Sequence, residues 1–199
     1  MNENTLPRLL TILCVSLGLL LGGCSAAKEQ EQPPLAGARI GGPFTLTDQK
    51  GRQVSSSDFE GKYRLVYFGF ASCPDVCPVD LQVIGQSLRQ LEKSDPTIAA
   101  KVQPIFITVD PERDTPPVMG RYVSLFHPRL IGLTGTPKEI AAVAKAHGIY
   151  YSKQGEGSDY MVDHARMVLL FGPKGEPIAI IPHEKGANGM TAELRKWVR

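Results

Sequence analysis

Two segments restrict the possible folds of this chain most strongly, because almost every residue in them is apolar. They are Tyr63–Phe70 and Val102–Val109. A strand with one face in water alternates apolar and polar residues, whereas unbroken apolar runs are typical of strands buried on both faces of a sheet. Between the two runs, Leu81, Ile84 and Leu88 recur at the spacing of one helix face. This order predicts an α/β core in which helices cover a sheet.

The rest of the chain continues the alternation of strands and helices. The turn Asp48-Gln49-Lys50-Gly51 predicts a hairpin over Pro43–Val54. Helices are expected at Pro78–Lys93, Pro116–Phe126, Pro137–His147 and Thr191–Arg199, and further strands at Leu130–Leu133, Met167–Phe171 and Ile178–Pro182. Together these elements predict an α/β domain with a mixed central sheet, an N-terminal hairpin and flanking helices.

The N-terminus has the pattern of an export signal. Leu9–Leu21 is apolar for 13 residues, which is shorter than the roughly 20 residues of a membrane-spanning helix. It fits the apolar region of a secretory signal, about 7–15 residues long. The following Leu21-Gly22-Gly23-Cys24 resembles a bacterial lipobox, in which a cysteine is lipidated and becomes the new N-terminus.

This pattern divides the chain into three parts. Residues 1–23 are expected to be a lipoprotein signal peptide, residues 24–38 a flexible tether beginning at the lipidated Cys24, and residues 39–199 the folded domain. The alternative is a plain signal peptide or short anchor with an incidental cysteine. Either alternative exports the domain, and lipidation would anchor it to a membrane, facing the periplasm or the cell exterior.

Composition argues against a nucleic-acid partner. The 22 basic and 20 acidic residues leave a net charge of +2, without the clustered basic patch that usually binds nucleic acid. Of four cysteines, Cys14 leaves with the signal peptide and Cys24 carries lipid, so Cys73 and Cys77 remain in the domain. In an oxidising exterior a lone close pair is a disulfide bridge, a redox couple or a metal clamp.

The pair Cys73 and Cys77 lies between the strand Tyr63–Phe70 and the first long helix. A helix N-terminus favours the thiolate, the form that binds metal or attacks a disulfide. One helical turn separates the two residues, which predicts that both sulfurs share a face. The spacing C-x-x-x-C is wider than the C-x-x-C of thioredoxins. By itself it leaves a redox pair, a metal site and a structural bridge open.

His164 is the third candidate of the site, with Asp163 beside it. It precedes the strand Met167–Phe171, and in a thioredoxin-like arrangement the residue before this strand faces the cysteine loop. Two thiolates and an imidazole suit copper, as Cu(I) or Cu(II), and zinc accepts the same set. Asp163 is either a partner that orients the imidazole ring or only a loop cap.

Five motifs together resemble the Sco (SenC) family of thioredoxin-fold proteins for copper-centre assembly in cytochrome c oxidase. They are Asp58-Phe59-Glu60-Gly61-Lys62, Tyr67-Phe68-Gly69-Phe70 with Cys73-Pro74-Asp75-Val76-Cys77-Pro78, Asp110-Pro111-Glu112-Arg113-Asp114-Thr115-Pro116, Leu133-Thr134-Gly135 and Tyr160-Met161-Val162-Asp163-His164. The resemblance implies a thioredoxin-like fold and copper ligands at Cys73, Cys77 and His164. Ala165 departs from the family, which usually carries Ser or Thr there, and many relatives use a transmembrane helix in place of a lipid anchor.

The leading hypothesis for the function is therefore a copper metallochaperone. It would deliver copper to the copper-bearing subunit of a respiratory oxidase, or to another copper acceptor. The alternative is a thiol–disulfide oxidoreductase in which Cys73 and Cys77 keep the acceptor's cysteines reduced; only this alternative makes the chain an enzyme. The other histidines, His127, His147 and His183, are expected to be structural. The run Asp110–Thr115 is either a docking loop or a solvated loop that caps the next helix.

Overall fold

The computed structural model describes residues 31–157 and 159–199. The predicted signal peptide, the predicted lipidation site Cys24 and the first part of the predicted tether lie outside the described residues. The folded unit extends from Pro33 to Arg199, so it begins before the predicted start at residue 39. The backbone N–H of Leu35 donates to the carbonyl of Ile178 at 3.0 Å, which ties the last part of the predicted tether to the domain.

A seven-stranded mixed sheet forms the centre of the domain, in the order β2-β1-β5-β4-β3-β8-β9. The strands are β1 Thr45–Asp48, β2 Gln53–Ser55, β3 Tyr63–Gly69, β4 Val102–Thr108, β5 Ile131–Thr134, β8 Val168–Phe171 and β9 Pro177–Ile181. β3, β4 and β5 run parallel, and the outer pairs are antiparallel. The two apolar runs are β3 and β4, side by side in the interior of the sheet, as predicted.

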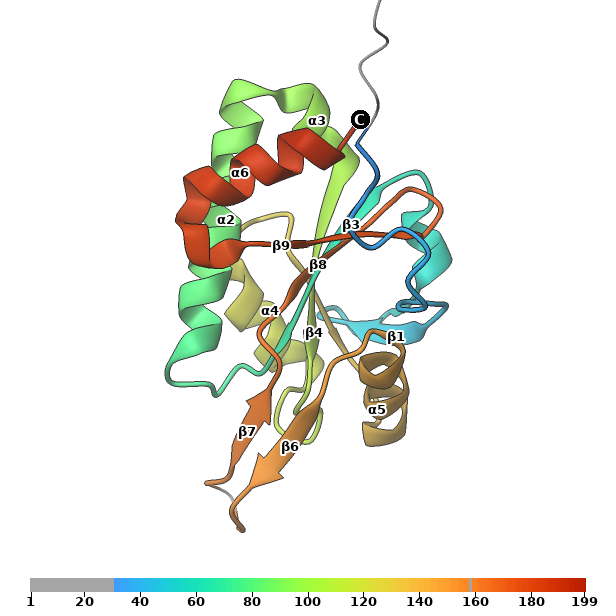
Figure 1. The fold of residues 1–199 in the computed structure, drawn as a ribbon. Coiled ribbons are helices and arrows are strands. Elements are labelled where there is room, and N and C mark those ends of the chain that lie inside the picture. The colour runs from blue at the N-terminus through green and yellow to red at the C-terminus, as the bar shows by residue number, and fades with distance from the viewer. Residues whose placement is uncertain (1–30, 158) are drawn as a thin grey trace, which may run out of the picture. The chain divides into compact units, whose positions relative to one another are not determined.

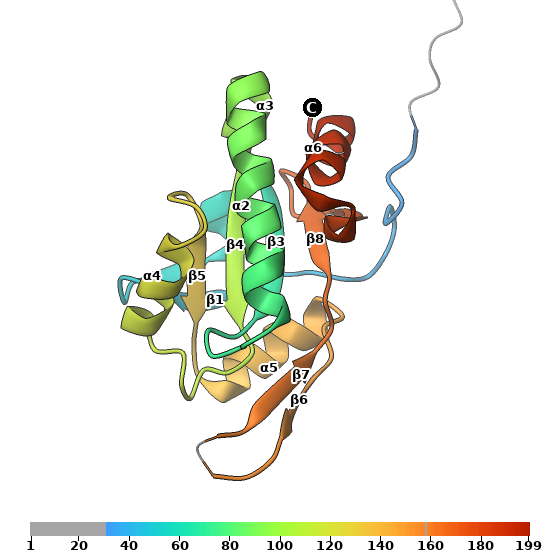
Figure 2. The same cartoon turned by 90° about the vertical axis from the view of Figure 1, so that its left-hand side faces the viewer.

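Helices cover both faces of this sheet. They are α2 Val76–Ser94, α3 Pro96–Lys101, α4 Pro116–Ser124, α5 Pro137–Ala146 and α6 Gly186–Trp197, with short 3-10 turns η1 Ser56–Phe59 and η2 His183–Lys185. α2, α4 and α6 lie on one side of the sheet and α5 lies on the other (Figure 1; Figure 2). This arrangement confirms the predicted mixed sheet, N-terminal hairpin and flanking helices.

A second, two-stranded sheet was not predicted. It is the hairpin of β6 Tyr151–Gln154 and β7 Met161–His164, which extends from the end of the main sheet where α2 begins (Figure 1; Figure 2). Its strands are short and mostly polar, so they lack an apolar pattern long enough to indicate a strand. β7 changes the setting of His164, which ends a strand of its own as well as preceding the strand expected at Met167–Phe171.

Helix boundaries also differ from the predictions. Helix α3 was not predicted, because no element was expected between the helix Pro78–Lys93 and the strand Val102–Val109. The side chain of Asp95 accepts a hydrogen bond from the N–H of Ile98 at 3.1 Å, and Pro96 occupies the first turn. Such an N-cap followed by proline starts a new helix. α6 begins earlier than the predicted Thr191, and α4 ends before Phe126.

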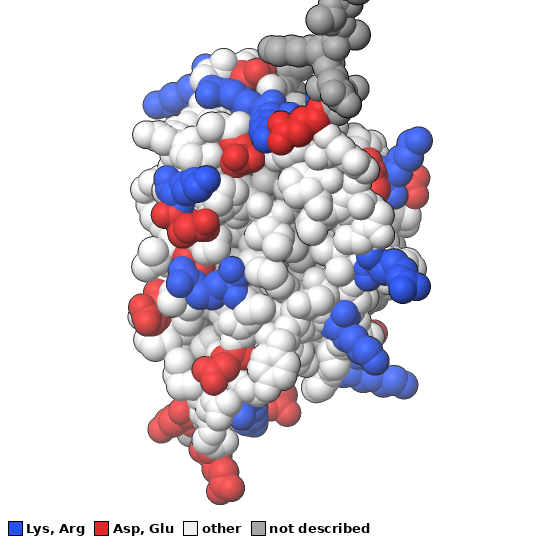
Figure 3. All heavy atoms as spheres, in the orientation of Figure 1, with Lys and Arg blue, Asp and Glu red and all other residues white. Residues whose placement is uncertain are grey.

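The surface of the domain mixes charges of both signs. On the face shown in Figure 3, basic and acidic side chains alternate around the margin and the centre is uncharged. Among the described residues, no helix is both long and apolar enough to cross a bilayer.

Candidate metal centre

The two cysteines of the domain lie between the end of β3 and the first turn of α2. Cys77 occupies the first turn of α2 and is fully buried, whereas Cys73 precedes the helix and is 9% exposed. The backbone N–H of Cys73 donates to the carbonyl of Phe70 at 3.3 Å, which closes the loop. A Cβ at Gly69 would lie only 2.9 Å from the Cys77 sulfur. Glycine is therefore needed at this position for the sulfur to pack against the end of β3.

His164 reaches the buried cysteine from the β6–β7 hairpin. Its Nε2 lies 3.2 Å from Sγ of Cys77, and its Nδ1 lies 3.2 Å from the carbonyl oxygen of Ala165. A carbonyl oxygen only accepts hydrogen bonds, so this contact assigns the imidazole proton to Nδ1. The lone pair on Nε2 then faces the sulfur, which is the orientation that a metal ligand needs.

Aromatic rings enclose the imidazole. Tyr67 and Phe70 meet the ring of His164 edge-on, with centroids 6.2 Å and 6.1 Å away and interplanar angles of 79° and 88°. Burial lowers the pKa of His164, because the charged imidazolium is poorly solvated there. The ring is therefore neutral at pH 7 and able to coordinate a metal ion.

The predicted effect of the helix N-terminus on the thiol of Cys77 is reversed. Burial, and in addition the neighbouring Cys73 thiol, raise the pKa of Cys77 above its ordinary value. The helix dipole favours a thiolate only modestly, while complete removal from water disfavours it strongly. Cys77 is consequently a protonated thiol at neutral pH. A bound metal would have to replace that proton.

The structure brings two of the three predicted ligands into contact. Cys77 and His164 meet directly, but no three His, Cys, Asp or Glu side chains in residues 31–157 and 159–199 converge closely enough to hold a metal ion. Cys73 lies in the loop before α2. The helical spacing that predicted a shared face for both sulfurs therefore does not apply to it. The thiol of Cys73 nevertheless lies beside that of Cys77, because the two side chains interact and Cys73 raises the pKa of Cys77.

Asp163 is exposed on β7, opposite Ser152 of β6. The contact that orients the His164 ring through Nδ1 is made by the backbone carbonyl of Ala165. Burial lowers the pKa of His164 more strongly than the charge of Asp163 raises it. Its influence in this geometry is electrostatic.

Comparison with known proteins identifies the family. The SCO1/SenC family model matches residues 32–199. The chain belongs to the SCO1/SenC family. The mitochondrial SCO2 homologue of Bos taurus is 41% identical over 204 residues, which cover 96% of this chain and 76% of that protein.

Two solved structures of SCO1/SenC proteins match the domain closely. Copper-bound ScoI of Bradyrhizobium japonicum is 41% identical with a TM-score of 0.72, covering 79% of this chain and 99% of that one. Copper-bound ScoI of Arabidopsis thaliana is 38% identical with a TM-score of 0.73, covering 79% and 97%. The thioredoxin-like fold expected from the sequence motifs is thereby confirmed.

In this SCO1/SenC chain a buried carboxylate, Asp80, supports the cysteine helix. It lies on α2 one turn after Cys77, and Tyr67 donates its hydroxyl to Oδ2 at 2.7 Å. His183 Nε2 is 3.4 Å from the same oxygen. Although burial opposes ionisation, hydrogen bonds from His183, Arg166 and Tyr67 hold the pKa of Asp80 well below its usual value. Asp80 was not among the residues predicted for the site. The feature that could have indicated it is the presence of an acidic residue on the apolar face of a helix.

Arg166 connects this carboxylate to the histidine segment. Its Nε and Nη2 donate to Oδ2 and Oδ1 of Asp80 at 3.0 and 2.6 Å, a two-pronged ion pair. Arg166 closely follows His164 in the chain, and Asp80 closely follows Cys77. The ion pair therefore joins the two ligand-bearing segments of the SCO1/SenC chain at a second point.

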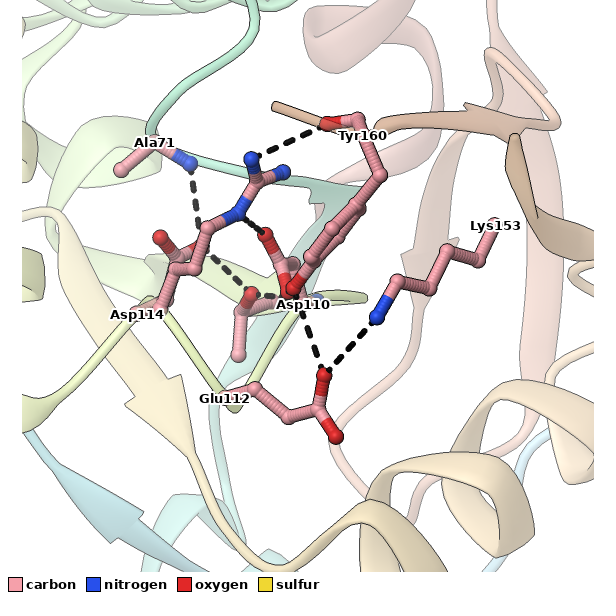
Figure 4. A network of polar contacts seen from close by, with 8 residues as sticks. Ala71, Asp110, Glu112, Asp114, Lys153 and Tyr160 are labelled. Carbon is pink, nitrogen blue, oxygen red and sulfur yellow. Dashed lines mark hydrogen bonds and ion pairs between the residues drawn. The ribbon is translucent and has the colours of Figure 1, made fainter. Parts of the chain in front are cut away.

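The Asp110–Thr115 run forms a buried bridge to the cysteine loop (Figure 4). Asp114 is fully buried, and its Oδ2 accepts hydrogen bonds from the Ala71 N–H at 2.9 Å and the Thr108 hydroxyl at 2.6 Å. Thr115 is the N-cap residue of α4, as expected, although its side chain makes no capping hydrogen bond. The run is therefore bonded to the interior through Asp114. A solvated loop was one of the two expectations, and at Asp114 the run is buried instead.

The same run also holds the β6–β7 hairpin. The hydroxyl of Tyr160, just before β7, donates to Asp110 Oδ1 at 2.5 Å, and Arg113 Nη1 donates to the Tyr160 carbonyl at 3.0 Å. Lys153 of β6 pairs with Glu112 at 3.3 Å and lies over the Tyr160 ring, as Figure 4 shows. One loop thereby positions both the segment before Cys73 and the hairpin that carries the histidine.

The other three histidines each contact groups outside the Cys77–His164 pair. His127 Nε2 lies 3.4 Å from a carboxylate oxygen of Glu92. His147 Nδ1 lies 2.8 Å from the carbonyl oxygen of Val143, and its ring packs among aromatic side chains. His183 contacts the buried carboxylate described above.

Proposed function

We propose that this chain is a copper metallochaperone that holds copper through Cys73, Cys77 and His164. It passes the ion to the copper-bearing subunit of a respiratory oxidase, or to another copper acceptor. The 3.2 Å contact between Cys77 Sγ and His164 Nε2 carries the proposal. Sulfur with imidazole nitrogen is a donor set suited to copper. Two solved relatives, 41% and 38% identical, were determined with copper bound.

The geometry supports a site that both loads and releases its cargo. Copper enters when it displaces the thiol protons, and the neutral imidazole needs no deprotonation at Nε2. Three protein ligands leave room for an incoming ligand. A thiolate of the acceptor can therefore bind copper before a ligand of this chain dissociates. The hairpin position of His164 places that ligand at the surface end of the site, because its ring is only partly buried.

The thiol–disulfide alternative uses the same cysteines. In that reaction one thiolate attacks an acceptor disulfide, and the second cysteine resolves the mixed disulfide, which leaves Cys73 and Cys77 oxidised and the acceptor reduced. Burial raises the pKa of Cys77, so this residue is a poor nucleophile at neutral pH. The contact between Cys77 Sγ and His164 Nε2, which exchange does not require, favours metal binding over exchange.

Replacing His164 by alanine separates the two functions. The measurements are Cu(I) affinity, by competition with a chromophoric chelator, and the rate of exchange with a model disulfide. His164→Ala is expected to weaken copper binding by about 100-fold or more and to leave exchange intact. His127→Ala is the matched control, because it removes a buried histidine that contacts Glu92 instead of the cysteines. Unchanged copper affinity in His164→Ala would refute the proposed ligand set.

The location of the protein is a second part of the proposal. We infer that residues 1–23 are removed, that Cys24 is lipidated, and that residues 24–38 connect the lipid to the domain in the periplasm or at the cell exterior. In cells fed labelled palmitate, the mature chain is expected to carry label and to sediment with membranes. Cys24→Ser should abolish both results, while Cys14→Ser, within the apolar stretch, should leave both intact. Label that persists in Cys24→Ser would contradict lipidation at this residue.

A further inference from the structure

Arg64 is a buried cation in the interior of the sheet. It is the second residue of β3, surrounded in sequence by Tyr63, Leu65 and Val66, and is only 5% exposed. Its guanidinium lies over the ring of Phe171, with Cζ 5.4 Å from the ring centroid. Within the described part of the chain, no carboxylate forms an ion pair with it. An arginine in an otherwise apolar strand therefore needs a physical explanation.

The position of Arg64 is energetically unfavourable without an anion. Guanidinium remains charged at all physiological pH values, and burial of a charge without a partner strongly opposes folding. Burial lowers the pKa of Arg64, which shows how poorly the charge is solvated. An apolar residue on the same strand would avoid this penalty. Such sites are commonly retained because they bind something.

A cavity of about 660 Å³ adjoins the guanidinium. Its lining includes Arg64, Lys174 and the residues Ser55–Ser57, so two cationic residues and three serines border one space. The volume is within the range of small-molecule sites, roughly 300–1,000 Å³. The hydroxyl of Ser56 accepts a hydrogen bond from the Phe44 N–H at 3.3 Å, which leaves its own proton available to a ligand.

Gly175 keeps the space beside the guanidinium open. It has a positive φ of 84°, and a Cβ at this position would lie 2.7 Å from Nη2 of Arg64. Any larger residue would be strained in its backbone and would collide with the arginine. The turn between β8 and β9 therefore leaves one edge of the guanidinium accessible.

One carboxylate belongs to this cavity, and a second acts on Arg64 from the adjacent turn. Glu60 is part of its lining. Glu176 is exposed, and its Oε2 accepts a hydrogen bond from the backbone N–H of Lys174 at 2.9 Å. The charge of Glu176 opposes the fall in the pKa of Arg64, but its carboxylate is held at the turn. It is thus a competitor for a ligand rather than the partner of the arginine.

The cavity is separate from the metal centre. Arg64 is near the start of β3, whereas Gly69 at its end contacts Cys77. At about 3.3 Å per residue, the two sites are roughly 16 Å apart along the strand. Ligand binding here is therefore measurable independently of copper.

We propose that this cavity binds a small oxyanion, a carboxylate or a phosphate, through two-pronged hydrogen bonds from Arg64. Lys174 adds charge, and the hydroxyls of Ser55–Ser57 add hydrogen bonds at the rim. The planar guanidinium matches both oxyanions in geometry.

The test is calorimetric titration of the full-length chain in detergent, without copper and at constant ionic strength. Inorganic phosphate and succinate are the two probes, titrated separately, and they distinguish a phosphate from a carboxylate ligand. At least one is expected to bind saturably. Arg64→Met, which keeps the length of the side chain but removes its charge, should weaken that binding by about tenfold or more. Glu176→Gln should strengthen it, because a competing carboxylate is removed.

The controls separate this proposal from the metal site. Copper affinity should stay unchanged in Arg64→Met and Glu176→Gln, and His164→Ala should bind the oxyanion normally. Should Arg64→Met fail to fold, Arg64→Lys replaces it. That variant retains charge but loses the two-pronged geometry, and it should bind the oxyanion more weakly. The proposal is overturned if neither probe binds saturably, or if the arginine variant binds as tightly as the unchanged chain.

Discussion

Asp80 and Arg166 form a two-pronged ion pair that joins the helix carrying Cys77 to the segment carrying His164. The two distances are 3.0 and 2.6 Å, across 86 residues of sequence. Cys77 precedes Asp80 by one helical turn, and His164 lies just before Arg166. The separation between Cys77 and His164 is therefore held at two points, their own contact and this ion pair.

Removing the carboxylate of this pair should weaken copper binding without touching a ligand. Asp80→Asn leaves Arg166 without its counter-ion, so the segment after His164 loses its fixed position. We expect Cu(I) affinity to fall by about 10–100-fold and stability by about 1–3 kcal/mol, less than for a fully buried pair because Arg166 is half-exposed. Chelator competition and urea denaturation measure the two effects.

The control for this variant is a similar ion pair far from the site. Arg52 Nε and Nη2 donate to Oδ2 of the buried Asp48 at 2.8 and 2.7 Å. Asp48→Asn should reduce stability and leave copper affinity unchanged. Equal losses of copper affinity in Asp48→Asn and Asp80→Asn would show that the effect is general destabilisation.

Copper loading should depend strongly on pH because of Cys77. Burial raises the pKa of this thiol, so it is protonated in the copper-free protein between pH 6 and 8, and binding must release its proton. The apparent affinity for Cu(I) is expected to rise by about tenfold per pH unit for each proton released. Competition titrations at several pH values measure the slope. An affinity independent of pH would mean that Cys77 does not bind as a thiolate.

Gly69 is predicted to be irreplaceable. In Gly69→Ala the new Cβ would lie 2.9 Å from the Cys77 sulfur and 3.0 Å from the Phe106 ring, so the cysteine or the strand must shift. We expect about 1–3 kcal/mol of destabilisation together with weaker copper binding. Gly120→Ala is the matched control, since its nearest neighbour is 3.6 Å away in a helix. That control should be neutral or slightly stabilising, and similar losses in both variants would refute the packing explanation.

Asp114 is expected to hold the cysteine loop in place. Asp114→Ala removes the acceptor for the Ala71 N–H and the Thr108 hydroxyl, both of which would remain buried without a partner. We expect a loss of about 1–3 kcal/mol in unfolding free energy and faster copper release. Asp48→Asn, which changes a buried carboxylate in the turn between β1 and β2, is the comparison. Release rates that match the unchanged chain would show that this loop does not position Cys73.

Stability should fall in mild acid because of His147. Burial lowers the pKa of His147 below the ordinary histidine value of about 6.5, so the unfolded chain takes up the proton first as the pH falls. The unfolded state then binds more protons, and the unfolding free energy decreases from about pH 6.5 down to the lower folded pKa. His147→Phe removes this group and should flatten the decrease between pH 7.5 and 5. An unaltered pH slope in urea denaturation would contradict this assignment.

Local pattern was sufficient for much of this protein. The apolar runs of β3 and β4 and the helix between them follow from residues that are contiguous in sequence, because the periods of strands and helices are local properties. The motif containing Cys73 and Cys77 and the Asp163-His164 pair was likewise readable as a metal site. The β6–β7 hairpin and α3 could not be predicted from local pattern, since short polar elements take their structure from tertiary contacts.

Only the tertiary structure decided how the site is arranged. The contact of Cys77 with His164 spans 87 residues and depends on how a separate hairpin docks on the main sheet. The reversed pKa of Cys77 follows from complete burial, which overrides the local helix N-terminus. The sequence by itself indicated the fold, which the structure confirms, and named the candidate ligands. The distances, the ion pair behind the ligands and the cavity beside Arg64 arise from remote segments, whose meeting no local pattern encodes.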